Sequence, residues 1–443
     1  MNTKLWNRRS FVKTSAVMGT GLLVRTPHLF AAPAYLKDRN PSDKLNIACI
    51  GVANRGGANV DGVSGENIVA ICDIDDNYLE MVGKRFPNAK RFFDYRDLLD
   101  QMGDQLDGIT VSTADHTHAA AAIAVMKRGI HCYCEKPLAY NINEVRLMQK
   151  TARENNIVTQ MGTQIHAGSN YRRVVELIQS GAIGEITDVY LWTSGSAVGL
   201  KPPTDKVECP KNIHWEQWLG PVPYCDYHPV YLPGSWRVWR KFGNGRFGDM
   251  ACHLTDIVFW SLGIRTPISV WAKDPENSEP VDPACTPPRL QVEYQFKRPD
   301  SEKPLALHWT IGDPPAILGE NRMPKWGQAI LFVGSEGKLL LDYDRNILFP
   351  EEKFLEFKRP EPTIPDSIGH HAEWLKGIRQ NDPRQPLCEF EYAGCLTEAV
   401  LLASVSYYAG QKEIFWNPDK MKVENLPEAN QFLTREYRDG WGF

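Results

Sequence analysis

Two short segments of the chain contain side chains suited to moving a proton at a hydroxyl group. CYCEKP, residues 132–137, places Lys136 after an apolar stretch. GDMACHLTDIVFW places Asp249, His253 and Asp256 at i, i+4 and i+7, on one face of a helix. An ammonium group stabilises a developing alkoxide, and imidazole accepts a proton near neutral pH. Lys136, Asp249 and His253 are therefore candidate catalytic and substrate-binding residues.

The same residues also allow structural interpretations. Glu135 could form a surface salt bridge with Lys136, although adjacent side chains on an extended segment diverge. Asp249 could cap a helix and His253 could be a hydrogen-bonded core histidine, and the spacing alone leaves this open. A metal site would need a further ligand beside the two carboxylates and the histidine, so we predict none.

A glycine-rich turn follows the first apolar run. GVANRG, residues 51–56, has the pattern Gly-x-Ala-x-x-Gly, with Ala53 at the middle position. Small residues let backbone N–H groups approach a pyrophosphate at a helix N-terminus. Asp73 ends the next apolar run, where its carboxylate would accept ribose hydroxyls and repel a 2′-phosphate. We predict bound NAD rather than NADP, although Asn54 and Arg55 weaken the preference for NAD. The predicted contacts in this turn are Gly51, Ala53, Asn54, Arg55 and Gly56.

Two further polar segments follow apolar runs. STADHTHAA places Ser112, Thr113 and His116 after one run, and Glu135 and Lys136 follow the next. The carboxyl ends of parallel strands face the ligand crevice, so we predict all five as cofactor contacts. Pro137 removes a backbone donor and restricts the turn after Lys136. For His118, helix capping or loop hydrogen bonding is the favoured interpretation.

The elements that position these residues follow two patterns. Up to about residue 165, apolar runs alternate with helical segments, which indicates βαβ units and a parallel sheet. Beyond residue 185, longer alternating runs such as RLQVEYQF and PLALHWTI indicate an open antiparallel sheet. Residues 196–245, rich in Pro, Trp and Tyr, form a long irregular segment with a functional or wrapping role.

We therefore predict an α/β protein with a Rossmann dinucleotide-binding domain at residues 35–165. A C-terminal α/β domain with a large, mostly antiparallel open sheet follows at 166–443. The last helix of the Rossmann domain could come from a later segment.

Residues 1–34 have the pattern of a twin-arginine export signal. Arg8 and Arg9 precede a short apolar run, and small residues allow cleavage near Ala32 or Ala34. This predicts a periplasmic protein, and a disordered basic tail is the alternative. The apolar run is too short to span a bilayer.

Composition excludes several kinds of partner. Without residues 1–34 the chain has 45 basic and 54 acidic residues, a net charge of −9, which argues against nucleic acid and anionic membranes. The ten cysteines have no metal-finger spacing, so we expect free core thiols.

Six motifs in order resemble the glucose–fructose oxidoreductase / inositol dehydrogenase / MocA family. They are GVANRG, CDID, STADHTHA, CEKPLA, MGTQ and the D-x-A-x-H-x-x-D run from Asp249, and they cover roughly residues 45–265. The departures are Ala53 and Ala251, where the family has glycine. The resemblance implies that Lys136, Asp249 and His253 occupy the family's catalytic positions.

The same resemblance implies further site residues and a subunit contact. Gln164, in the MGTQ motif, is expected at the cofactor and His166 at the substrate. GSWRVWRKFGNGRFGDM resembles a secreted subgroup, in which Trp236 and Arg237 reach the cofactor or substrate. The large sheet of the family often forms a dimer or tetramer interface, so we expect a homo-oligomer.

These observations support one main hypothesis and two alternatives. The first is an NAD-dependent oxidoreductase acting on a secondary hydroxyl of a sugar or cyclitol, with a cofactor that stays bound during export. The second is an NAD-dependent, redox-neutral glycosidase or lyase that passes through a transient keto-sugar. The third is a sugar-binding protein without chemistry.

Overall fold

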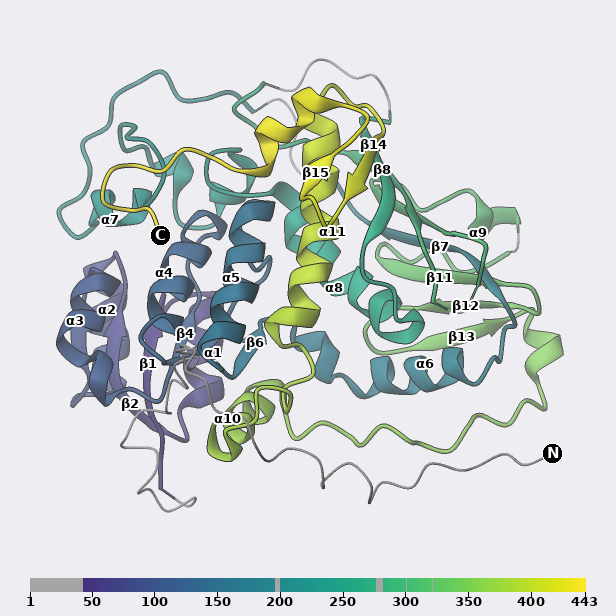
Figure 1. Ribbon diagram of the computed structural model, residues 1–443, viewed down its shortest axis with the longest axis horizontal. Helices are drawn as coiled ribbons and strands as arrows, with labels where there is room; N and C mark the ends of the chain where they lie inside the picture. Colours follow the sequence, from purple (N-terminus) through teal and green to yellow (C-terminus); the bar gives the residue numbers. More distant parts are fainter. Residues whose placement is uncertain (1–42, 196–199, 276–281, 300, 321) are drawn as a thin grey trace, which may run out of the picture.

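The computed structural model describes residues 43–195, 200–275, 282–299, 301–320 and 322–443, which build two β-sheets with helices around them (Figure 1). The predicted export signal lies outside the described residues. The first sheet is parallel and has the strand order β3-β2-β1-β4-β5-β6. Its strands are β1 (Asn46–Ile50), β2 (Asn67–Cys72), β3 (Lys90–Phe92), β4 (Gly108–Val111), β5 (His131–Cys134) and β6 (Thr159–Met161).

Helices connect these strands in the βαβ manner that the sequence predicts. They are α1 (Arg55–Val63), α2 (Asp76–Arg85), α3 (Tyr95–Met102), α4 (Asp115–Met126) and α5 (Ile142–Glu154). Asp75, Asp94 and Asn141 cap α2, α3 and α5, because each side chain accepts a hydrogen bond from a free N–H of the first turn. β4 and β5 are buried along their whole length, as expected for strands covered on both faces. The predicted Rossmann architecture is confirmed.

The second sheet has nine strands in the order β13-β12-β11-β7-β10-β9-β8-β14-β15. Only the β7–β10 pair is parallel among its strand pairs in the described residues. β9 and β10 alternate strictly between buried and half-buried residues, since one face packs on the core. The strands are β7 (Ile186–Thr193), β8 (Pro267–Lys273), β9 (Leu290–Phe296), β10 (Leu305–Ile311), β11 (Ala329–Gly334), β12 (Lys338–Leu341), β13 (Asn346–Phe349), β14 (Ile414–Asn417) and β15 (Lys422–Val423).

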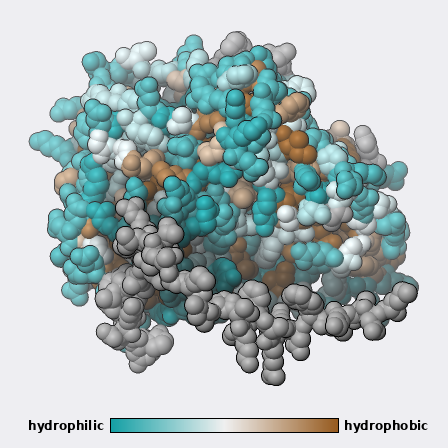
Figure 2. All heavy atoms as spheres, viewed as in Figure 1, coloured by the Kyte–Doolittle hydropathy of each residue, from teal (hydrophilic) through white to brown (hydrophobic). Residues whose placement is uncertain are grey.

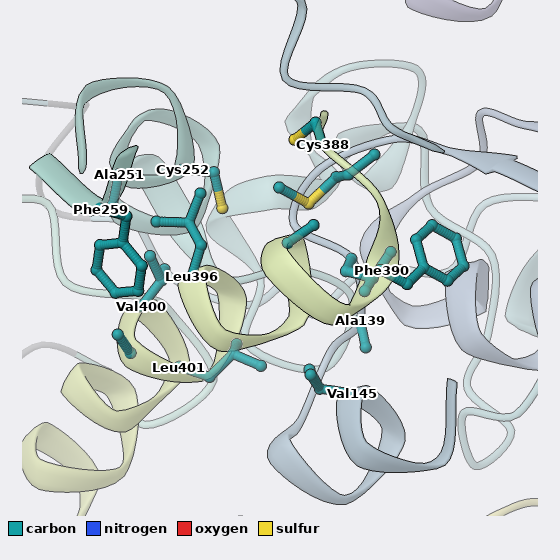
Figure 3. Close-up of a cluster of buried hydrophobic side chains, with 14 of the residues drawn as sticks. Ala139, Val145, Ala251, Cys252, Phe259, Cys388, Phe390, Leu396, Val400 and Leu401 are labelled. Atoms are coloured by element: carbon teal, nitrogen blue, oxygen red, sulfur yellow. The ribbon is translucent and has the colours of Figure 1, made fainter. Parts of the chain in front are cut away.

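Helix α11 (Phe390–Tyr408) runs between the two sheets and joins their cores (Figure 1). It contacts α5 of the first domain and β8 of the second. Its buried side chains meet those of α5 and α8 in one apolar cluster, which includes Leu396 and Phe259 (Figure 3). The remaining helices are α6 (Ser169–Gln179), α7 (Trp215–Leu219), α8 (Gly245–Leu262), α9 (Ile317–Glu320) and α10 (His370–Gln380). The continuous core means that α11 fixes how the two sheets face each other.

Short 3₁₀ turns and one late helix complete the architecture. Helix α10 packs against α1, and its fully buried Trp374 joins the apolar cluster beneath β1. A segment late in the chain therefore covers a face of the first sheet. The 3₁₀ turns are Gly103–Gln105, Gln164–Ala167, Pro229–Tyr231, Ser235–Val238, Glu351–Phe354 and Pro427–Leu433.

Two irregular segments lie side by side over the first domain. We call residues 200–244 the aromatic segment, because its tryptophans and tyrosines form their own buried cluster around Trp218 and Tyr231. Residues 434–443, the C-terminal strap, end beside α7 (Figure 1). Arg438 of the strap donates to Gly220 O at 2.9 Å, and the Arg96 guanidinium stacks on the ring of Trp441 at 3.8 Å. The strap thus ties the aromatic segment to helix α3.

The exterior is largely hydrophilic on the face drawn in Figure 2. Within the described residues, no helix has the length and apolar character that a membrane crossing requires.

Replacing Leu396 by Ala should lower the free energy of unfolding by about 2–5 kcal/mol, because Leu396 is fully buried where α5, α8 and α11 meet. The matched control is Leu355→Ala, at a residue that is 81% exposed. This substitution should change the free energy of unfolding by less than about 0.5 kcal/mol. Urea titration followed by circular dichroism measures both. Equal small effects would contradict a core centred on α11.

Candidate active site

The glycine-rich turn between β1 and α1 is built from positions where a side chain does not fit. Gly51 has φ +78°, and a Cβ there would lie 2.4 Å from Ser112 O. A Cβ on Gly56 would lie 2.2 Å from Gly51 O. Asn54 also has a positive φ, of 52°, so the chain turns sharply before α1 begins at Arg55. The turn therefore exposes backbone at the N-terminus of α1, as a pyrophosphate site requires.

A cavity of about 360 Å³ opens at the carboxyl ends of β1, β2 and β4, in front of this turn. Its opposite wall comes from the aromatic segment, through Trp218, Leu232 and Pro233 among others. The cavity thus lies between the parallel sheet and a segment from the second half of the chain. Of the predicted cofactor contacts, it is lined by Gly51, Ala53, Asn54, Arg55, Asp73, Ser112, Thr113, Trp236 and Arg237.

Asp73 ends β2 at the edge of this cavity. Its two carboxylate oxygens accept hydrogen bonds from Val52 N at 2.9 Å and Asp75 N at 3.1 Å. Burial raises the pKa of Asp73 to about 6, against the lowering effect of these backbone donors. The group is therefore mostly a carboxylate at pH 7 and can accept ribose hydroxyls. Its position matches the sequence expectation for a ribose contact.

Glu135 supports the glycine-rich turn through one carboxylate oxygen. Its Oε1 accepts hydrogen bonds from Arg55 Nε at 3.1 Å, Asn59 Nδ2 at 2.9 Å and Gln164 Nε2 at 2.9 Å. Glu135 and Gln164 are outside the residues that line the cavity, so they act on it through Arg55. Asn59 also donates to Ser112 Oγ at 2.8 Å. No pattern in the sequence singles out Asn59.

His116, a predicted cofactor contact, is outside the residues that line the cavity. The ring is fully buried, with its nitrogens 2.8 Å from Trp218 O and 3.2 Å from Phe242 O. Burial lowers its pKa to about 3, so the imidazole is neutral and joins α4 to the aromatic segment. His118 contacts Pro137 O at 2.8 Å and Thr113 O at 3.1 Å, which is the loop hydrogen bonding expected for it.

Lys136 and Asp249 form an ion pair between the two domains. Lys136 follows β5, and its Nζ lies 2.5 Å from Asp249 Oδ1 and 2.7 Å from Asp249 O. Arg237 Nε also contacts Asp249 Oδ1, at 3.2 Å. Burial opposes ionisation of Asp249, but the charges of Lys136 and Arg237 prevail and lower its pKa to about 2. Asp249 is thus a carboxylate at any physiological pH.

His253 lies one helical turn after Asp249 on α8 and is half-buried. Burial and the nearby charge of Lys136 lower its pKa to about 3, so its imidazole is neutral at pH 7. Its Nδ1 is a buried atom without a hydrogen-bond partner in the described part of the chain. Tyr171 fixes the helix here, since its hydroxyl donates to His253 O at 3.1 Å. The ring is therefore held on a fixed turn of α8 and is partly open to solvent.

The three predicted catalytic side chains are thus brought together, next to the cavity. Lys136 and Asp249 are in direct contact, and the charges of both act on the pKa of His253, which Lys136 lowers and Asp249 raises. Arg237 connects this group to the cavity, because it lines the cavity and also pairs with Asp249. A dinucleotide held at the Gly51–Gly56 turn could extend along the cavity to this group.

His166, a predicted substrate contact, points into the core. The side chain is 1% exposed, its Nδ1 lies 2.9 Å from both carboxylate oxygens of Asp256, and its ring stacks on Trp260. Tyr392 donates to Asp256 Oδ1 at 2.7 Å. No pattern in the sequence indicates that His166 pairs with Asp256. His166, Asp256 and Cys388 each offer an atom that could bind a metal, and these three atoms lie within 4.8 Å of one another. The absence of a metal stays a prediction.

The fold and site together define a two-domain protein of the dinucleotide-dependent oxidoreductase class. The chain belongs to the glucose–fructose oxidoreductase / inositol dehydrogenase / MocA family of oxidoreductases. Residues 45–163 match the NAD-binding Rossmann fold of this family, and residues 182–298 match its C-terminal alpha/beta domain. The two ranges cover more than half of the chain. The first domain is therefore an NAD-binding domain.

Curated relatives are similar over part of their length. A glycosyl hydrolase family 109 protein of Shewanella pealeana is 29% identical over 203 residues, which are 41% of this chain and 44% of that protein. Myo-inositol 2-dehydrogenase of Thermotoga maritima is 24% identical over 229 residues, which are 50% of this chain and 67% of the relative. The chain thus matches less than half the length of the first relative.

A solved structure shows the same fold over nearly its whole length. The WlbA dehydrogenase from Bordetella pertussis, in complex with NADH and UDP-GlcNAcA, superposes with a TM-score of 0.60 at 16% identity. The match covers 84% of this chain and 99% of that one.

Replacing Gly56 by Ala should weaken NAD binding at least about tenfold, because the new Cβ would displace the Gly51 carbonyl and open the turn. Gly57→Ala is the matched control, since its Cβ would lie 3.5 Å from Val52 O, an ordinary contact. Calorimetric titration of nucleotide-free protein with NAD measures both. Similar affinities for the two variants would contradict a pyrophosphate site at this turn.

Proposed function

We propose that this protein oxidises a secondary hydroxyl of a sugar or cyclitol in the periplasm, with a bound NAD that passes the hydride on to a second sugar or another acceptor before the next turnover. The observation that carries the proposal is the group formed by Lys136, Asp249 and His253, which Arg237 joins to the cavity in front of the NAD-binding turn. The relative named myo-inositol 2-dehydrogenase supports a polyhydroxylated substrate. The Arg8–Arg9 motif supports export.

NAD fits the residues that would hold it. The turn at Gly51 and Gly56 leaves room for a pyrophosphate beside backbone N–H groups, and Asp73 supplies a ribose acceptor that disfavours a 2′-phosphate. A neighbour of the same fold has been solved with NADH. We therefore favour NAD over NADP. When bound, NAD supplies the acceptor for the hydride that leaves the substrate carbon.

The proton of the hydroxyl is handled by the chain's own residues. The Lys136 ammonium donates to the substrate oxygen and favours its alkoxide form. His253, neutral at pH 7, accepts the proton at its imidazole ring. The Asp249 carboxylate raises the proton affinity of that imidazole and holds Lys136 in position. Asp249 itself stays ionised throughout, since its pKa is about 2.

The bound nucleotide and its response to sugars test this function. The purified protein should release NAD on denaturation, identified by chromatography and mass spectrometry. Sugars and cyclitols added to the intact protein should convert the bound NAD to NADH, seen in its absorbance. Protein that neither contains nor binds NAD, or NAD that no polyol reduces, would contradict the proposal.

A redox-neutral glycosidase or lyase is the second candidate. It is favoured by the similarity to a protein named as glycosyl hydrolase family 109. Such an enzyme would oxidise a sugar carbon, remove the proton that the new keto group acidifies on the neighbouring carbon, and eliminate the glycosidic substituent from the carbon after that. It would then add water to the double bond and return the hydride to the keto carbon, so each cycle restores the bound NAD. Product analysis separates the candidates. Glycoside cleavage without net NADH, lost when NAD is stripped, would favour this one.

Sugar binding without chemistry is the remaining alternative. It predicts sugars that bind to the protein with NAD present and never reduce it. The assembled group of Lys136, Asp249 and His253 argues against it. We further propose a homo-oligomer through the second sheet, whose strands β8 and β14 expose Trp271 and Phe415.

The C-terminal strap explains how NAD could stay bound outside the cytoplasm. The aromatic segment forms one wall of the cavity through Trp218 and Gly234. The strap holds that segment, since Arg438 donates to Gly220 O at 2.9 Å and Glu216 O at 2.5 Å and pairs with the Glu216 carboxylate. Release of the dinucleotide would require this wall to move away from the sheet.

Arg438→Ala should therefore speed the release of bound NAD at least about tenfold, since it removes charge-assisted hydrogen bonds that anchor the wall. The matched control is Arg384→Ala, at a side chain that is 94% exposed. NAD remaining with the protein during dialysis, or competition with a fluorescent analogue, measures the rate. Equal release from both variants would show that the strap does not retain the cofactor.

Lys136→Met should lower turnover at least about hundredfold and leave NAD bound, because the ammonium acts on the reacting oxygen and is outside the cavity lining. Lys150→Met, at a side chain that is 60% exposed, serves as the control. Rates of NAD reduction and the amount of bound nucleotide are measured together. Turnover close to that of the unmodified protein would exclude Lys136 from the mechanism.

A further inference from the structure

The carboxylate of Asp249 lies among more positive charge than it can balance. Lys136 is 2.5 Å from it, Arg237 is 3.2 Å and Arg246 is 3.5 Å, so three cations surround one anion. The neighbouring His253 is neutral and adds nothing to the count. Partly buried charges are costly unless they are paired. The charge around Asp249 is therefore unusual for a cleft that binds only neutral molecules.

The other carboxylates nearby do not remove this excess. Glu135 forms an ion pair with Arg55, so the charges of these two residues balance each other. Asp115 interacts with Arg237 and Lys136, and is buried where it accepts hydrogen bonds from Asn244. Counting Asp115 and Asp249 as ionised against Lys136, Arg237 and Arg246 still leaves one positive charge.

Arg246 is the one of these three cations that has no role in the proposed reaction. Lys136 is held by two short contacts, and Arg237 lines the cavity in front of the NAD-binding turn. Arg246 lies on the other side of Asp249, where it donates to Thr193 Oγ at 3.2 Å, at the end of β7. Its side chain is 30% exposed, and its contact with Asp249 is long. Most of its five N–H groups are therefore open to a ligand.

The surroundings of Arg246 suit the rest of a sugar. Tyr343 follows β12 and its ring is 6.2 Å from that of His253. Burial raises the pKa of Tyr343 to about 12, so its hydroxyl is neutral at pH 7. Gln328 accepts from Thr193 Oγ at 3.3 Å, beside Arg246. Donors and acceptors for sugar hydroxyls thus lie between Arg246 and His253.

We infer that the substrate is an acidic sugar, whose carboxylate binds Arg246 while its reacting hydroxyl lies at Lys136 and His253. The guanidinium matches a carboxylate because its planar fork of N–H groups can form two parallel hydrogen bonds. One carboxylate also neutralises the one excess charge. The inference rests on the proposed oxidation and narrows its substrate to sugars of the hexuronate class.

Matched sugar pairs test this inference on the protein with its bound NAD. Glucuronate against glucose and galacturonate against galactose differ at C6 alone, and calorimetry gives both affinities. At least one uronate should bind at least about tenfold more tightly than its neutral partner, and added salt should reduce that advantage. Equal affinities within both pairs, or no binding by either uronate, would overturn the inference.

Arg246→Gln should lower the ratio of the two affinities roughly tenfold or more. Arg246→Lys keeps the charge without the fork and should restore part of the ratio. Arg384→Gln is the exposed control. If Arg246→Gln weakens both sugars equally, Arg246 only positions Asp249 and the inference fails. Neutral sugars that reduce the bound NAD while uronates do not would sustain the oxidoreductase and exclude the acidic substrate.

Discussion

The ion pair between Lys136 and Asp249 is the contact on which the site depends, because it joins the loop after β5 of the NAD-binding domain to the first turns of α8. Both partners are largely withdrawn from water, so loss of either leaves the other as a costly unpaired charge. The pair therefore ties the loop after β5 to α8 at the site itself, and Arg237 contacts the same carboxylate.

The rest of the fold makes that position rigid. Helix α11 shares one apolar core with α5 and α8, so the two ends of the ion pair are carried on packed elements rather than on mobile loops. The aromatic segment and the strap enclose the cofactor side, where His116 joins α4 to that segment. A site between domains is thus supported by contacts on both of its flanks.

The sequence predicted the parts of the site that depend on local pattern. The Gly51–Gly56 turn, Asp73 at the end of β2 and the spacing of Asp249 and His253 on one helix all follow from periodicity and turn chemistry. Partners distant in the chain could not be predicted. His166 and Asp256 are 90 residues apart, and nothing local indicates that the histidine turns into the core instead of the cleft.

The electrostatics of α8 show why such distant partners decide the chemistry. Asp249 and His253 are one turn apart, and each keeps the form that a hydride transfer needs: a carboxylate and a neutral imidazole. On an isolated helix they would titrate near their ordinary values. Burial raises the pKa of Asp249, but the charges of Lys136 and Arg237 outweigh it and lower that pKa. Burial and the charge of Lys136 lower the pKa of His253, so Lys136 stabilises the carboxylate and also keeps a proton off the imidazole. The same positive charge that prepares these two groups also favours a negatively charged substrate beside them.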